Sequence, residues 1–86
     1  MSDPTYPTDN HPEPVLRLAL EIDRARISDF AARWIIEYAD AGECGLAYDT
    51  FIYEIENGTY TPSPEALTLL QKAAAIMEIA FPNKSA

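Results

Sequence analysis

The chain has 86 residues, with 14 acidic and 6 basic side chains, so its formal net charge is −8. This length allows one small domain, and a hydrophobic content of 48% is typical of a globular rather than a disordered chain. The charge disfavours binding to nucleic acid or anionic lipid, because both depend on Lys and Arg side chains that neutralise phosphates.

Residues 1–13 are predicted to be a flexible proline-rich tail, since Pro4, Pro7 and Pro12 disfavour a helix. The start of the chain lacks the basic and apolar regions of a secretory signal. No apolar stretch approaches the roughly 20 residues of a membrane span. The single cysteine excludes an internal disulfide. We therefore expect a cytoplasmic protein that contacts no membrane.

The first helix is predicted from residues 13–14 to residues 24–26, with proline tolerated in its first turn. Val15, Leu18 and Ile22 have the spacing of one buried stripe.

The second helix is predicted between Ser28, a favourable N-cap, and Ala41, with Gly42 as its stop. Apolar residues lie on most sides of this segment, so it is expected to be the central helix. A row at positions i, i+4 and i+8 is formed by Phe30, Trp34 and Tyr38.

The third helix is predicted from residue 43 or 44 to residue 56, and the pair at 57–58 ends it. Its expected core stripe is Cys44, Ala47 or Tyr48, Phe51 and Ile55. The opposite face carries Asp49, Tyr53 and Glu56, with Glu54 to one side.

The fourth helix is predicted to begin with Ser63 as N-cap and Pro64 in its first turn. Its expected seam is Leu67, Leu70, Ala74, Met77 and Phe81, with Pro82 after it. Four short-linked helices predict an all-α fold, a compact antiparallel bundle in a single domain at 14–82, followed by a tail at 83–86.

Residues that could support catalysis are few. His11 lies in the predicted tail, and Cys44 has no base beside it, so it is interpreted as a core cysteine. One cysteine and one histidine cannot form a zinc site, and the carboxylates lack the spacing of a calcium loop. We therefore expect no enzyme activity, catalytic residue, metal, cofactor or small-molecule substrate.

The charges are unevenly distributed along the chain. No basic residue lies between Arg33 and Lys72, whereas seven acidic residues do: Glu37, Asp40, Glu43, Asp49, Glu54, Glu56 and Glu65. Such polarisation favours association with an oppositely charged partner.

The most distinctive motif is G-E-C-G-L-A-Y-D at residues 42–49. Gly42 is expected to reverse the chain, and Gly45 to let the third helix approach the second closely. The motif follows Glu37-Tyr38 and precedes a helix that ends in Y-E-I-E-N, a Pro-Ser connector and a last helix with Leu-Leu and Met. In this order, residues 28–80 resemble small helical immunity proteins of the MafI type.

The resemblance implies a protein that binds the toxin of its own cell and keeps it inactive. The expected partner is a cognate toxin, a basic nuclease domain bound one to one, with no nucleic acid bound. Because each member of such a family fits its own toxin, the resemblance assigns no residue. From the charge pattern we predict a partner-binding site made of Glu37, Asp40, Glu43, Asp49, Tyr53 and Glu56. Carboxylates accept charge-assisted hydrogen bonds, and Tyr53, together with Tyr60, is expected to anchor the interface.

Two other functions stay open from the sequence. A small helical DNA-binding regulator or antitoxin would use the third helix to read the DNA bases. That helix has three acidic residues and no Lys or Arg, which is the wrong charge for this role. An acidic mimic of nucleic acid that inhibits a DNA-binding protein has the same charge as an immunity protein, and the sequence does not separate the two.

Overall fold

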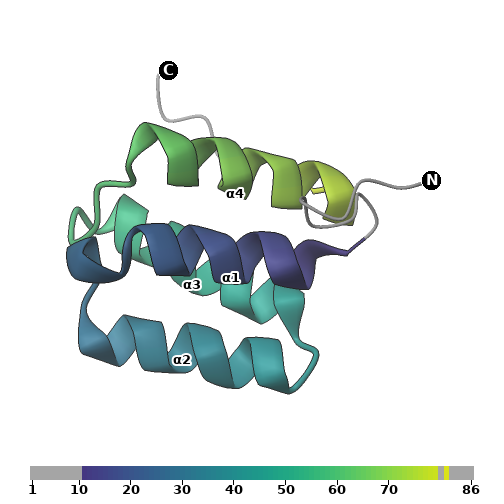
Figure 1. The fold of residues 1–86 in the computed structure, drawn as a ribbon, viewed down its shortest axis with the longest axis horizontal. Helices are drawn as coiled ribbons and strands as arrows, with labels where there is room; N and C mark the ends of the chain where they lie inside the picture. The colour runs from purple at the N-terminus through teal and green to yellow at the C-terminus, as the bar shows by residue number, and fades with distance from the viewer. Residues whose placement is uncertain (1–10, 80, 82–86) are drawn as a thin grey trace.

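The computed structural model describes residues 11–79 and 81, and within this part the backbone forms four α-helices and one short 3₁₀ helix, without strands. The elements are α1 (Pro12–Ile22), η1 (Arg24–Arg26), α2 (Asp29–Asp40), α3 (Cys44–Glu56) and α4 (Pro64–Met77). Successive helices reverse direction (Figure 1). The predicted all-α antiparallel bundle is confirmed.

The helices pack as two pairs, α1 mainly against α4 and α2 mainly against α3. Figure 1 shows α1 between α4 and α2, with α3 behind it. The prediction that the second helix is central is therefore wrong. α2 buries only one face, through Ala31, Ala32, Ile35 and Ala39.

The buried face of α1 is rotated from the predicted one. Its buried residues are Val15, Leu16, Ala19 and Leu20. Leu18 is only partly buried and Ile22 is exposed, so the predicted stripe through them is wrong. The buried face of α4 also consists largely of small residues, namely Ala66, Ala73 and Ala74.

The corner between α2 and α3 forms as expected at Gly42 and differs at Gly45. Gly42 has φ +78°, and the Glu43 N–H donates to the Tyr38 carbonyl over 2.8 Å, which closes a Schellman motif. A Cβ at Gly45 would meet no atom within 4 Å. The missing side chain of Gly45 is therefore not what lets α3 pack against α2, and the prediction of a close approach at this residue was wrong.

Both serine caps are confirmed. The Ser28 hydroxyl accepts from the Ala31 N–H over 3.1 Å, and the Ser63 hydroxyl from the Ala66 N–H over 3.2 Å. α4 ends at Met77, where Glu78 adopts φ 60°, earlier than the predicted seam required. Phe81 packs on the core from outside the helix.

The segments predicted as tails are only partly described. α1 begins at Pro12, inside the segment predicted as the first tail. The predicted tail residues 1–10 and 83–86 lie outside the described residues.

A buried carboxylate joins the end of α1 to the start of α4. Asp23 is 1% exposed, and its Oδ2 accepts from the Tyr60 hydroxyl over 2.5 Å and from the Ser63 N–H over 2.9 Å. Arg26 Nε lies 3.8 Å from Oδ1. We call these four residues the Asp23 cluster. Burial alone would raise the pKa of Asp23, but the hydrogen bonds from Tyr60 and Ser63 outweigh it and hold that pKa below its ordinary value.

Tyr60 has a structural position. It is 2% exposed, and burial together with the hydrogen bond to Asp23 raises the pKa of its hydroxyl. The prediction that Tyr60 anchors a partner at the surface is therefore wrong. It holds the α3–α4 connector against the end of α1.

Candidate functional site

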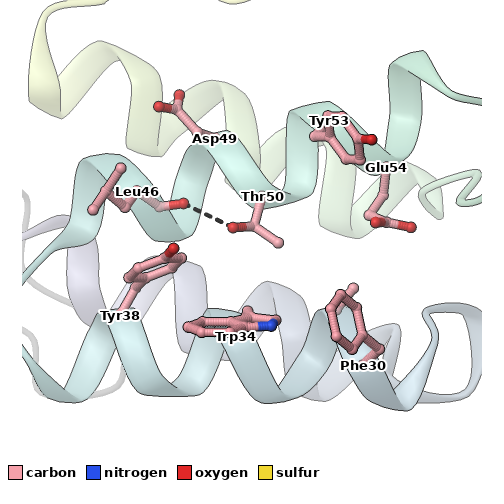
Figure 2. Close-up of a pocket in the computed structure, with 9 residues that line it drawn as sticks. Phe30, Trp34, Tyr38, Leu46, Asp49, Thr50, Tyr53 and Glu54 are labelled. Atoms are coloured by element: carbon pink, nitrogen blue, oxygen red, sulfur yellow. Dashed lines mark hydrogen bonds between the residues drawn. The ribbon is translucent and has the colours of Figure 1, made fainter.

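An open groove of about 330 Å³ runs between α2 and α3 (Figure 2). We call it the α2–α3 groove. Its lining residues are Phe30, Ala31, Trp34 and Tyr38 from α2, and Leu46, Asp49, Thr50, Tyr53 and Glu54 from α3. Aromatic and aliphatic side chains with a few polar groups are the composition of many binding surfaces.

Three aromatic rings of α2 lie in a row along the groove. The ring centroids of Phe30 and Trp34 are 6.4 Å apart at 71°, an edge-to-face contact, and those of Trp34 and Tyr38 are 5.5 Å apart. Residues four apart share a helix face, so the sequence spacing produces this row directly. Each ring supports the next, and the row offers a partner a preformed aromatic surface.

Phe30 and Trp34 of this row are more exposed than their size leads one to expect, whereas Tyr38 is partly buried against the core. Phe30 is 71% exposed, Trp34 43%, and Tyr53 on the facing helix 64%. A single exposed apolar residue is ordinary, but several large ones along one groove mark an interaction surface. The row belongs to the surface because α2 buries its alanines and Ile35 on its other face.

Glu54 is the polar residue best placed to act inside the groove. It is partly buried, and the Thr59 hydroxyl lies 2.6 Å from its Oε1 and 3.1 Å from its carbonyl oxygen. In Figure 2 its carboxylate extends from α3 toward α2, near Phe30, whereas Asp49 points away from α2. Thr59 thus holds a negative group over the aromatic row.

The four ion pairs within residues 11–79 and 81 lie away from the groove. Their cations are Arg17, Arg24 and Arg26, and their anions are Glu13, Asp23, Asp29 and Asp40. None of these anions lines the α2–α3 groove. Among the described residues, the ion pairs therefore involve anions of α1, α2 and the α1–α2 connection, and none of the carboxylates of α3.

The predicted site residues fall into separate groups. Asp49 and Tyr53 line the groove, and Glu56 is exposed one turn further along the same outward face of α3. Glu37 and Glu43 are exposed at the end of α2 and at the corner, outside the groove.

Asp40 is already engaged within the molecule. Its Oδ1 accepts from Arg17 over 2.7 Å, and Arg17 also contacts Glu13, so this carboxylate connects α2 to α1. Any partner would have to compete with that pair.

Sequence reasoning missed seven of the nine lining residues: Phe30, Ala31, Trp34, Tyr38, Leu46, Thr50 and Glu54. The spacing of the three aromatics was visible, but the helix that carries them was predicted to be central, and the row was not predicted as a binding surface. The signal that could have corrected this is the alanine and isoleucine face on the other side of α2, which is sufficient to bury the helix. Glu54 gave no signal, because its position depends on Thr59 in the following connector.

Three further findings concern the chemistry of the described residues. Burial, and then the charge of Glu13, raise the pKa of the Cys44 thiol, which favours the unreactive protonated form. Among residues 11–79 and 81, no three His, Cys, Asp or Glu side chains are grouped so that they could hold a metal ion. In that same part of the chain, no helix has the length and apolar character needed to cross a membrane.

Comparisons with models of protein families, with curated proteins and with solved structures gave no match.

Proposed function

We propose that this chain is a cytoplasmic bacterial immunity protein that binds one toxin domain of its own cell, a basic nuclease, and keeps it inactive. The observation that carries the proposal is the α2–α3 groove, an exposed aromatic row with carboxylates beside it. The sequence resemblance of residues 28–80 to MafI-type immunity proteins supplies the biological class.

The chemistry of the groove supports a protein partner. Trp and Tyr side chains supply much of the binding energy of protein interfaces, because they offer large rigid surfaces with a polar tip. Trp34 and Tyr53 combine those features with the exposure that a partner needs. A free groove of this composition is best explained as one half of an interface.

The charge supports a basic partner. The chain has a formal charge of −8, and the carboxylates of α3 lie in the stretch that lacks Lys and Arg. A nuclease needs a positive active site to receive phosphates, so a negative protein approaches it quickly and blocks it or a surface beside it. The same charge opposes the alternative of DNA binding, because α3 offers no cation to a phosphate.

The test is co-expression in bacteria with toxin domains encoded beside this gene. We expect growth to recover to the level of cells that produce a catalytically inactive toxin, and a one-to-one complex in size-exclusion chromatography with light scattering. Association should slow as salt rises, since steering by exposed charges is screened beyond about 8 Å at physiological ionic strength. Persistent toxicity in cells that contain folded, abundant protein would contradict the proposal.

A gel-shift experiment with random duplex DNA at low salt provides the control for the alternative. The immunity proposal predicts no shift. A salt-sensitive shift by the purified chain would favour the regulator instead.

A further inference from the structure

We propose that the α2–α3 groove binds an arginine side chain of the partner, with its guanidinium over Trp34 and its charge balanced by Glu54. This inference rests on the proposed function for the identity of the partner. The group recognised by the groove is then a guanidinium, and its main contacts are Trp34 and Glu54 rather than the carboxylates predicted from the sequence.

The aromatic row provides the first part of the argument. A cation is attracted to the face of an aromatic ring, most strongly to Trp, and Arg takes part more often than Lys. Trp34 lies between Phe30 and Tyr38, and both rings contact it. Figure 2 shows the indole lying across the space below α3, with its face toward Thr50. A planar guanidinium can stack there.

Glu54 provides the second part. Its carboxylate is held by Thr59 on the side of the groove that faces α2. A partly buried carboxylate beside an aromatic surface loses hydration when an apolar partner covers it, which costs free energy unless a cation accompanies that partner. The groove therefore favours a group that is flat, apolar on its faces and positive, and guanidinium has all three properties.

The charges also decide between possible occupants. A second copy of this chain would carry its own charge of −8 to the groove and bring two sets of α3 carboxylates together. An uncharged apolar ligand would leave Glu54 without a counter-ion. A basic protein that presents an arginine satisfies both the rings and the acid.

The first experiment uses the full chain and three blocked amino acids: N-acetyl-arginine amide, the lysine equivalent and the neutral citrulline equivalent. Trp34 is the only tryptophan, so its fluorescence and its indole N–H signal report directly on the groove. We expect the arginine amide to shift the Trp34 indole and the amides of Glu54 and Thr59, with a Kd of the order of millimolar. Lysine amide should bind about threefold more weakly than arginine amide, and citrulline amide should give no saturable shift.

Glu54→Gln and Glu56→Gln form a matched pair for this titration. Both remove one negative charge from α3, but only Glu54 lines the groove. Gln can still accept from Thr59, so the fold of the connector is retained. Glu54→Gln should weaken binding of arginine amide about fivefold or more, and Glu56→Gln less than about twofold. Equal effects, or the absence of any shift at Trp34, overturn the proposal.

The second experiment measures affinity for the toxin domain with the same pair and with Trp34→Leu, after circular dichroism has shown that each variant is folded. We expect Trp34→Leu and Glu54→Gln each to raise Kd about tenfold, while Glu56→Gln stays within about twofold. If all variants bind as the unchanged chain does, the arginine proposal fails and the immunity function stands. If the unchanged chain binds no toxin, the immunity function fails and the amino-acid titration still decides the groove.

Sedimentation equilibrium tests the second copy as occupant. The proposal predicts a monomer at micromolar concentration. A dimer that Trp34→Leu disrupts overturns it and assigns the groove to self-association.

Discussion

Tyrosine and carboxylate side chains occur together in two regions of this molecule, with opposite consequences. In the Asp23 cluster, Tyr60 donates to Asp23 in an almost fully buried contact. In the α2–α3 groove, Tyr53 and Glu54 lie at an open surface beside exposed rings. The same residue types thus stabilise the fold where they are buried and paired, and where they are exposed they form the surface that we propose for a partner.

The largest expected effect comes from removing the acceptor in the Asp23 cluster. Asp23→Ala leaves the buried Tyr60 hydroxyl and the partly buried Ser63 N–H without a partner, and a buried group left unpaired costs about 1–3 kcal/mol. We expect the free energy of unfolding in urea to fall by about 2–4 kcal/mol, which approaches the whole stability of a domain of this size.

Asp49→Ala is the control, because Asp49 is exposed at the groove. Its unfolding free energy should stay within about 0.5 kcal/mol of that of the unchanged chain. If Asp23→Ala leaves no folded protein to measure, Tyr60→Phe gives the same comparison at about 1–2 kcal/mol. Equal small effects at both acids would remove the contrast between the two regions.

Acid should reduce the contribution of Asp23. The pKa of Asp23 is lowered in the folded state, so its ionised form stabilises the fold. That stabilisation is complete above the unfolded-state pKa, about 3.9, and is lost as pH falls through the lower folded-state pKa.

The comparison partner for this measurement is Asp23→Asn, which resembles the protonated acid in shape. The difference in unfolding free energy between the unchanged chain and this variant should shrink as pH falls from about 5 toward 2. Urea titrations at several pH values would show it. A difference that stays constant over this range would mean that the cluster stabilises the fold without relying on the ionised form.

The smallest effects on stability are expected at the two glycines of the corner between α2 and α3. Gly42 has a positive φ, so Gly42→Ala should lower the unfolding free energy by about 1 kcal/mol. At Gly45 a methyl group enters open space on a helix, so Gly45→Ala should raise it by about 0.5 kcal/mol. Thermal and urea unfolding of the pair would check the opposite signs, and equal losses would show that Gly45 has a packing role after all.

The helix positions were predictable because their signals are local. Ser28 and Ser63 cap the following N–H groups, and Gly42 supplies the one conformation that the corner needs. Such interactions involve residues within one or two helical turns, so they can be predicted from neighbouring residues in the sequence.

The orientation of each helix was less predictable. Leu18 and Leu16 are equally apolar, and only the packing of the other helices against α1 determines that Leu16 is buried and Leu18 only partly so. Tyr53 and Tyr60 look alike in the sequence, yet only Tyr60 is buried, where it donates a hydrogen bond to Asp23, 37 positions earlier in the chain. Only two of the nine residues that line the groove were predicted for this reason: Asp49 and Tyr53 follow from the outward face of α3, while Trp34 and Glu54 depend on contacts between elements.

The alanines between α1 and α4 have a consequence for how this chain can change. Ala19, Ala66, Ala73 and Ala74 are at most 1% exposed, and a larger side chain at any of them would force the two helices apart. The exposed groove residues Phe30, Trp34 and Tyr53 carry no such restriction, because their outer atoms already face water. New recognition could therefore be acquired by exchanging a few groove side chains on an unchanged scaffold, and a library randomised at Phe30, Trp34, Tyr53 and Glu54 would retain its fold while it explores other partners.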